Sequence, residues 1–240
     1  MPSKNGNEWG KFLDKLTENT SCYAKEVQRN VLLHLSENET IRDNFFLTGG
    51  TALSVFYLHH RRSIDIDLFS VNQPPFDRVE AWVKNEWPTG YTTLIKEPYI
   101  LSVYLNGVKV DFVHDGMSFN DQKIPYPLDN NHSVFVDSLK NIASNKFCTL
   151  IGRQEPKDFI DFYFINKMKS LDINAIYSDA RRKEGMFDDP PMVAYQVENN
   201  LRLIIQNPYA FPELLVNFDI DEFSRFYEDL IYSLYYKKEG

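Results

Sequence analysis

The stretch FFLTGGTALSVFYLHHRRSIDIDLFS, residues 45–70, decides how the rest of the chain is read. It places two glycines after an apolar run, then four basic side chains, then two aspartates within an alternating apolar segment. Side chains two residues apart on a β-strand share a face, so Asp65 and Asp67 lie together while Ile64, Ile66 and Leu68 are expected to be buried. Two adjacent carboxylates repel each other and add no stability to such a strand. The pair therefore indicates a functional site.

A divalent metal site explains the aspartate pair best. A metal ion neutralises neighbouring carboxylates, and Mg²⁺ prefers oxygen ligands from protein carboxylates and substrate phosphates. Asp111 interrupts the apolar alternation of VKVDFV and is the candidate third carboxylate of a two-metal site. The alternative is that Asp65 and Asp67 line the solvent face of an edge strand, which would be the preferred reading of an isolated Asp-x-Asp. The glycines before the pair and the aspartate after it favour the metal site.

The glycine pair suggests a phosphate-binding turn between a strand and a helix. Gly49 and Gly50 would let backbone N–H groups approach a phosphate, and the hydroxyls of Thr48 and Thr51 could add donors. A Gly-Gly pair after a strand is more often only a turn. The segment is not a Walker A loop, because no Gly-Lys-Ser/Thr follows it.

Hydrophobic spacing predicts an α+β fold. Helices are expected over residues 8–18, 21–36, 51–58 and 76–86, and strands over 45–48, 64–69, 99–105 and 108–113. Asn106-Gly107 joins the last two strands and is a strong hairpin signal, because a type I′ turn needs positive φ at both positions. Residues 117–133 read as a polar, proline-containing connection, and the helices expected beyond it cover 138–150, 156–165, 172–183, 192–206 and 221–237. The predicted division is an α/β unit over residues 1–130 and a helical domain over 131–240.

Composition limits the class of protein. The 240 residues carry a net charge of −8, so a generally basic nucleic-acid binder is excluded. The two cysteines lack metal-type spacing and read as reduced thiols. The N-terminal segment has no apolar signal-peptide core, and no apolar run approaches the ~20 residues of a membrane span. We therefore expect a cytoplasmic protein with no membrane partner.

The motifs, taken in order, resemble a known group of enzymes. LTGGTAL, RRSIDIDLF and VDF are similar to the nucleotidyltransferase superfamily of DNA polymerase β type, in which a Gly-Gly or Gly-Ser turn and a helix precede Asp-x-Asp and a third Asp. More narrowly, the chain resembles the AbiEii/AbiGii toxin family, with its T-G-G-T-A-L start and H-R-x-S-x-D-x-D-L-F continuation. The family's later Lys, Arg and K-D-x-x-D correspond to Lys146, Arg153 and residues 157–161. Fourteen residues separate Gly50 from Asp65, slightly more than in the superfamily pattern, so the helix or the next loop must absorb the excess.

The resemblance implies a fold and a reaction. The fold is a small mixed β-sheet core flanked by helices and followed by a C-terminal helical domain. The enzyme would need Mg²⁺ or Mn²⁺, would use a nucleoside triphosphate as substrate, and would move a nucleoside monophosphate onto an acceptor with release of pyrophosphate. Typical members are toxins of toxin–antitoxin systems, and some act on the 3′ end of tRNA.

The resemblance also implies roles for individual residues. Asp65 and Asp67 would hold the metals, and Asp111 would hold the second metal and help to deprotonate the acceptor hydroxyl. Lys146 would contact the triphosphate, and Asp158 would act in catalysis or orient Lys146. The expected nucleotide-binding set comprises Thr48, Gly49, Gly50, Thr51, Arg62, Ser63 and Lys146.

Two of these assignments compete with plainer ones. Arg62 is favoured over Arg61 for pairing with phosphate, since Arg61 reads equally well as a solvated loop charge. Ser63 could bond either a phosphate oxygen or its own backbone turn.

Three functions are compatible with the sequence. The first is a nucleotidyltransferase toxin acting on tRNA, with a possible cognate antitoxin protein. The second keeps the chemistry but modifies a small molecule such as an aminoglycoside, or a protein hydroxyl, and the acidic composition favours it because tRNA binding needs basic surface. Basic residues between 140 and 183 weigh against that argument. The third is a catalytically silent binding protein, which the intact aspartates disfavour.

Overall fold

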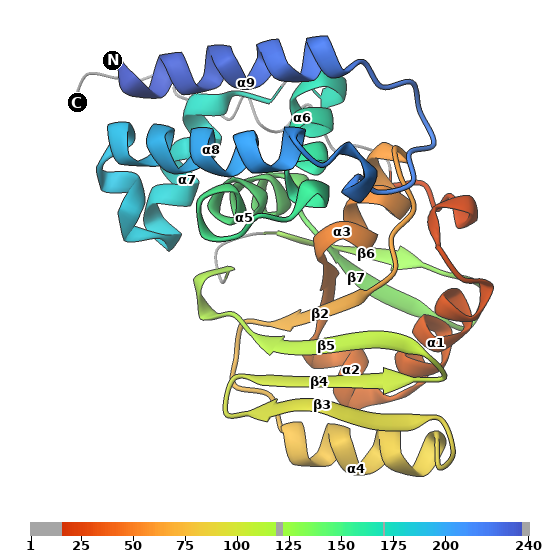
Figure 1. Cartoon of the computed structure of the whole chain (residues 1–240). Helices are drawn as coiled ribbons and strands as arrows, with labels where there is room; N and C mark the ends of the chain where they lie inside the picture. Colours follow the sequence, from red (N-terminus) through yellow and green to blue (C-terminus); the bar gives the residue numbers. More distant parts are fainter. Residues whose placement is uncertain (1–15, 119–121, 170, 237–240) are drawn as a thin grey trace, which may run out of the picture.

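The computed structural model describes residues 16–118, 122–169 and 171–236 and shows one mixed sheet with helices packed around it (Figure 1). The sheet has seven strands in the order β3-β4-β5-β2-β1-β7-β6. Their bounds are β1 (Phe46–Thr48), β2 (Ile66–Ser70), β3 (Tyr91–Glu97), β4 (Ile100–Leu105), β5 (Val108–His114), β6 (Lys123–Pro127) and β7 (Ser133–Asp137). The helices are α1 (Glu26–Glu37), α2 (Glu39–Asn44), α3 (Gly49–Ala52), α4 (Phe76–Glu86), α5 (Leu139–Gly152), α6 (Pro156–Lys169), α7 (Ile173–Lys183), α8 (Pro190–Ile205) and α9 (Ile220–Tyr235). The predicted α+β class is confirmed.

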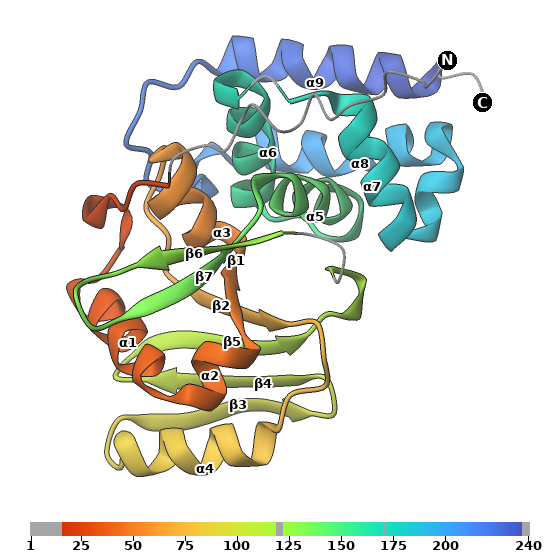
Figure 2. The ribbon, with the colours of Figure 1, turned by 180° about the vertical axis from the view of Figure 1, so that it is seen from behind.

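Two groups of helices enclose the sheet. Helices α1, α2 and α4 lie beside the strands, and α5 to α9 form a separate layer, which is above β2 in the view of Figure 1 (Figures 1 and 2). A continuous apolar core joins these layers and includes Phe112 of β5, Phe147 of α5 and Phe159 of α6, each of which is fully buried. The predicted helix over residues 8–18 falls almost entirely outside the described residues. Within those residues, no helix combines the length and the apolar character that crossing a bilayer requires.

Strand register brings the aspartates of the two predicted strands together. β2 runs parallel to β5, which places Asp67 directly beside Asp111, and antiparallel to β1, which places Thr48 opposite Asp67. The hairpin between β4 and β5 turns at Asn106 and Gly107, whose φ values are +49° and +76°. This confirms the predicted turn, because both central residues occupy the left-handed region that a type I′ turn needs.

The segment after the glycines is a short helix that widens. α3 continues into a π-helical turn over Leu53–Leu58, all of it buried, and the turn ends at His59 with a φ of +55°. A π-helix fits more residues into each turn than an α-helix does. This widened turn and the left-handed residue that closes it accommodate the extra length between Gly50 and Asp65.

The sheet extends further along the chain than the sequence predicted. The supposed polar connection contains β6, and β7 pairs in parallel with β1, so the change from sheet to helices comes at Ser138 rather than at residue 130. The pattern of β6 did not indicate a strand because it contains Pro125 and Pro127. A strand at the edge of a sheet tolerates proline, because its outer N–H groups need no partner. β3, at the opposite edge, was also not predicted, because most of its side chains are exposed and lack apolar alternation.

Candidate functional site

A cavity of about 570 Å³ opens between the sheet and helices α5 and α6. The glycine turn, the acidic strand ends and the basic helix ends all contribute to its wall. The lining residues are Thr48, Gly49, Gly50, Arg61, Ser63, Ile64, Asp65, Asp67, Phe69, Lys109, Asp111, Val113, Asp115, Ile142, Asn145, Lys146, Cys148, Thr149, Gly152, Arg153 and Lys157. The cavity therefore collects most of the site residues predicted from sequence, although Thr51, Arg62 and Asp158 are not in its wall.

The three predicted carboxylates lie close enough to repel one another. Asp67 and Asp111 are neighbours in parallel strands, and Asp65 precedes Asp67 by two residues. Burial, together with repulsion from Asp111 and Asp65, raises the pKa of Asp67 to about 6. Ile64, expected to be buried, is instead 55% exposed at the cavity mouth, because β2 begins only at Ile66.

The glycine turn is shaped by the groups beneath it. Gly49 has a φ of +66°, and a Cβ atom there would come within 2.1 Å of the Asp67 Oδ2 atom. A Cβ atom on Gly50 would come within 2.4 Å of an Arg61 Nη2 atom. The turn thus closes over one carboxylate and one guanidinium, and glycine is required at Gly49 for both conformation and space.

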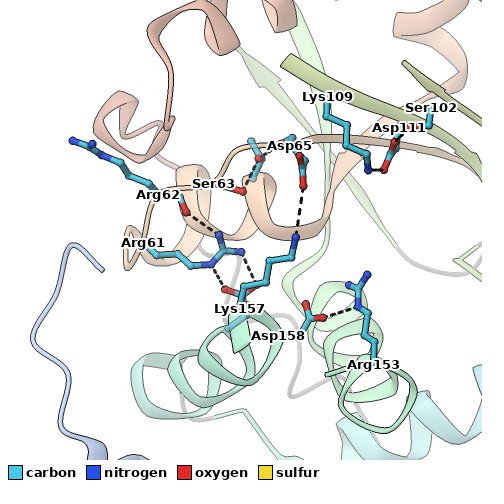
Figure 3. Close-up of polar contacts among 12 residues, drawn as sticks. Arg61, Arg62, Ser63, Asp65, Ser102, Lys109, Asp111, Arg153, Lys157 and Asp158 are labelled. Atoms are coloured by element: carbon cyan, nitrogen blue, oxygen red, sulfur yellow. Dashed lines mark hydrogen bonds and ion pairs between the residues drawn. The ribbon is translucent and has the colours of Figure 1, made fainter. Parts of the chain in front are cut away.

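Lysines pair with the carboxylates of Asp111 and Asp65 (Figure 3). Asp111 accepts hydrogen bonds from Lys109 Nζ and Ser102 Oγ, each at 2.5 Å. Lys157 Nζ lies 3.6 Å from Asp65 Oδ2. Within the described residues, no cluster of three or more His, Cys, Asp or Glu side chains is already arranged as a metal site. The donor chemistry nevertheless fits a hard cation, since all three aspartates offer oxygen ligands, and burial and repulsion at Asp67 outweigh the attraction of Lys146 and Lys109.

A buried ionic cluster forms the floor of the cavity. The carboxylate of Asp161 on α6 receives two hydrogen bonds from Arg61, at 2.6 and 2.8 Å, and lies 2.6 Å from Lys146 Nζ. Lys146 also donates to Asp158, whose other oxygen accepts from Arg153 at 2.6 Å (Figure 3). Three cations thus face two carboxylates, which leaves the cluster with a net positive charge toward the cavity.

Ion pairing within the cluster, rather than contact with water, stabilises its buried charges. Lys146 is 6% exposed, and the carboxylates of Asp158 and Asp161 are fully buried. Although burial alone would raise the pKa values of both carboxyl groups, Lys146 with Arg153 lowers the pKa of Asp158, and Arg61 with Lys146 lowers the pKa of Asp161 well below its ordinary value. Both groups therefore stay ionised at neutral pH. Lys146 donates to Asp158 at 2.7 Å and also lines the cavity.

His60 completes this cluster as a neutral member. Its Nε2 atom lies 2.8 Å from Asp161 Oδ1, and its Nδ1 atom has no hydrogen-bond partner within the described residues. Burial lowers the pKa of His60, opposing the effect of Asp161, and Arg61 and Lys146 lower it further. The Nε2–H tautomer donates to the carboxylate without adding a third cation beside Arg61 and Lys146.

The structure places the two arginines differently from the prediction. Arg62 is exposed and pairs with Glu213 at 3.2 Å, whereas Arg61 is buried against the glycine turn and lines the cavity. Arg61 rather than Arg62 is thus at the cavity wall, because the backbone after His60 directs Arg61 inward to Asp161. No nearby residue indicates this choice, because Asp161 lies one hundred residues further along the chain.

The predicted hydroxyl donors are bonded within the protein. Thr48 Oγ1 donates to Asp137 at 2.6 Å, and Thr51 Oγ1 hydrogen-bonds to Ser63 Oγ and to the Asp65 carbonyl. Thr51 is fully buried and does not reach the cavity. The two threonines thus fix the turn and the start of β2, while Ser63 lies at the cavity wall.

Comparison with known proteins identifies the family whose pattern this sequence matches. The sequence matches the family described as nucleotidyl transferase AbiEii toxin of type IV toxin–antitoxin systems over residues 31–232. An uncharacterized protein of Aquifex aeolicus is 28% identical over 154 residues, which cover 62% of this chain and 70% of that protein. The structure of JHP933 from Helicobacter pylori is 15% identical with a TM-score of 0.48, covering 89% of this chain and 93% of that one. MenT4, a nucleotidyltransferase toxin from Mycobacterium tuberculosis, is 13% identical with a TM-score of 0.49, covering 88% of this chain and 82% of its own.

Replacing Gly49 by alanine tests the packing of the turn on Asp67. The matched control is Gly107→Ala, since Gly107 also has positive φ, at +76°, but a Cβ atom there would meet nothing within 4 Å. We expect Gly107→Ala to lower the free energy of unfolding by about 1 kcal/mol, the cost of the left-handed conformation alone. Gly49→Ala should lower it by at least about 2 kcal/mol, because the collision with the carboxylate adds to that cost. Urea denaturation measures both, and equal losses would contradict the packing argument.

Substituting His60 tests its neutral role through pH. Because the folded-state pKa of His60 is lowered, the unfolded chain takes up the proton more readily, so stability is lost as pH falls below the unfolded value of about 6.5. His60→Gln keeps an N–H donor for Asp161 and cannot be protonated in this range. The stability of the wild-type chain relative to this variant should fall by about 1–2 kcal/mol between about pH 7.5 and pH 5. A difference that stays constant over this range, measured by denaturant titration, would show that His60 does not titrate as described.

Proposed function

The chain belongs to the AbiEii family of nucleotidyltransferase toxins, and from that premise we propose that it transfers a nucleoside monophosphate from a nucleoside triphosphate to the 3′-terminal hydroxyl of tRNA. The acceptor oxygen forms a bond to the α-phosphorus, and the bond between that phosphorus and the oxygen leading to the β-phosphate breaks. Pyrophosphate leaves, and the hydroxyl proton passes to a carboxylate at the site, for which Asp111 is the candidate.

One observation carries the proposal: carboxylates and cations of complementary roles line the same cavity. Asp65, Asp67 and Asp111 form one side, with Asp67 and Asp111 on strands whose register is fixed by the sheet and Asp65 just before β2. The opposite side carries Lys146 in the middle of α5, and Arg153 and Lys157 at the facing ends of α5 and α6. A triphosphate needs both groups, since its negative charge must be balanced while its reacting phosphorus is held in line with the attacking oxygen.

Asp65, Asp67 and Asp111 would hold the divalent metal, with Mg²⁺ or Mn²⁺ as the candidates. When bound, the metal would supply positive charge to the triphosphate and to the attacking oxygen. Arg61 and Asp161 hold the glycine turn in place, so that the backbone amides of Gly49 and Gly50 can bind phosphate oxygens. Lys146, held by Asp158, would contact the triphosphate from the helical side.

An anionic acceptor is favoured over a small cationic one by the surface that adjoins the cavity. At the cavity wall, the Arg153 side chain is 52% exposed. Beyond the wall, α7 carries the exposed Arg181 and Arg182, and the next residue, Lys183, hydrogen-bonds to Asn145 of the cavity. Arg181 pairs with Asp188 at 2.5 Å and Arg182 with Asp179 at 2.7 Å, so RNA phosphates would compete with these carboxylates for the two guanidinium groups. The family's toxin–antitoxin association supports a cognate antitoxin as a partner.

Nucleotide transfer tests the proposal directly. The protein would be incubated with each α-labelled nucleoside triphosphate, Mg²⁺, and either total tRNA, aminoglycosides or a protein extract. We expect label on tRNA, and we expect Asp67→Asn to reduce transfer by at least about a thousandfold, because the variant keeps the shape but loses a metal-binding charge. The matched control is Asp77→Asn, which removes a carboxylate from an exposed ion pair with Lys96 and should leave transfer unchanged.

The other outcomes separate the alternatives. Label on an aminoglycoside or on protein alone would replace the acceptor while keeping the chemistry. If neither transfer nor triphosphate binding occurs under any condition, the nucleotidyltransferase proposal itself is wrong for this chain.

A further inference from the structure

The cavity has two chemically different ends along the strands. The glycine turn and Asp65 form one end, where Lys157 approaches from α6. Two residues beyond the paired aspartates of β2 and β5, Phe69 and Val113 pair on the same strand face. That pair is about 7 Å further along the sheet, given the rise of a β-strand. The cavity thus passes from a charged end to an apolar platform.

Helix α5 runs along the cavity in the opposite direction, from the apolar end to the charged end. Near its start, Asn141 donates to Ser118 at 2.8 Å, and Ser118 donates to Asp115, which lies just beyond β5. Its last turn leads to Arg153 and Lys157, at the Asp65 end. Ile142 lies near the start of the helix, Asn145 lies one turn further on at its middle, and both line the cavity. Ile142 therefore belongs to the apolar end, with Phe69 and Val113, and Asn145 lies between that end and Lys146.

The side-chain amide of Asn145 has a defined orientation. Lys183 donates to Asn145 Oδ1 at 2.7 Å, and the same ammonium group also donates to Ser144 Oγ at 2.7 Å. An ammonium group has only donors, so the oxygen of Asn145 must face Lys183 and the NH₂ group must point away from it. Within the described residues, this NH₂ group makes no side-chain hydrogen bond.

We propose that Asn145 is the residue that selects the nucleobase of the incoming nucleoside triphosphate. The inference rests on the proposed function and names a substrate contact in the same cavity. Phe69, Val113 and Ile142 provide apolar surface for a planar base while its triphosphate lies toward the glycine turn. The Asn145 N–H group, held by Lys183, donates to a carbonyl oxygen or ring nitrogen of the base and disfavours a base that presents an amino group at that position.

Equilibrium binding of non-hydrolysable α,β-methylene analogues of ATP, CTP, GTP and UTP to the full chain tests this proposal without turnover. Isothermal titration gives the four dissociation constants for the wild-type protein, in which the tightest and weakest analogues should differ by about tenfold or more, the effect of one matched hydrogen bond. Asn145→Asp keeps an oxygen for Lys183 but replaces the N–H donor with an acceptor. This variant should change the order of preference among the four analogues.

Two lysine variants distinguish an effect on the orientation of the Asn145 amide from a general effect of removing a positive charge. Lys183→Met removes the group that fixes the amide, so Asn145 can present either its oxygen or its nitrogen, and the spread among the four constants should narrow to about threefold or less. Lys140→Met is the matched control, because Lys140 lies on the same helix as Asn145 but pairs with Asp179 at 2.7 Å. This control should leave the order and the spread of the four dissociation constants unchanged. Thermal melting of every variant confirms that the fold is retained.

The results distinguish this inference from the proposed function. If the analogues bind but all four constants are equal in the wild-type protein, or if Asn145→Asp preserves the wild-type order, Asn145 does not select the base while the transferase proposal stands. If no analogue binds the wild-type protein in the presence of Mg²⁺, both the base-selection inference and the proposed function are wrong.

Discussion

The ion pair between Arg61 and Asp161 is the interaction on which the site depends most. It joins the loop that precedes β2 to helix α6, two segments one hundred residues apart in sequence, through two short hydrogen bonds in a fully buried setting. Removing one partner from such a pair leaves an unpaired buried charge, at a cost of about 3–5 kcal/mol. The same pair places Arg61 beneath Gly50 and shares Asp161 with Lys146, so it fixes both the glycine turn and the basic floor of the cavity.

The sheet and the helices therefore contribute opposite charges to one space. The strands present repelling carboxylates, with the pKa of Asp67 raised to about 6, while the ionic cluster presents an excess of positive charge. Neither arrangement stabilises the free protein as well as apolar packing would. Both are complementary to a triphosphate with its divalent cation, which supports the view that the fold retains unfavourable charges for function.

The sequence allowed the local features to be predicted and left the long-range ones open. The hairpin at Asn106-Gly107 and the helices beyond Ser138 depend on nearby residues, so their patterns were sufficient. That Asp67 lies beside Asp111 depends on strand order, which periodicity does not specify. Asp111 was a candidate partner because it interrupts the apolar alternation of VKVDFV, and the family resemblance implied the same residue. The inward turn of Arg61 rather than Arg62 depends on the backbone after the π-helical turn and on a carboxylate in the other half of the chain. β6 was missed because its prolines are compatible with a strand only at a sheet edge.

A crystal structure of the wild-type protein with a non-hydrolysable nucleoside triphosphate and Mg²⁺ tests the central claim most directly. The account predicts density for the triphosphate between the backbone of Gly49 and Gly50 and the side chain of Lys146, with the base against Phe69 and Val113. Density for the nucleotide elsewhere on the protein, with this cavity containing only solvent, would contradict it.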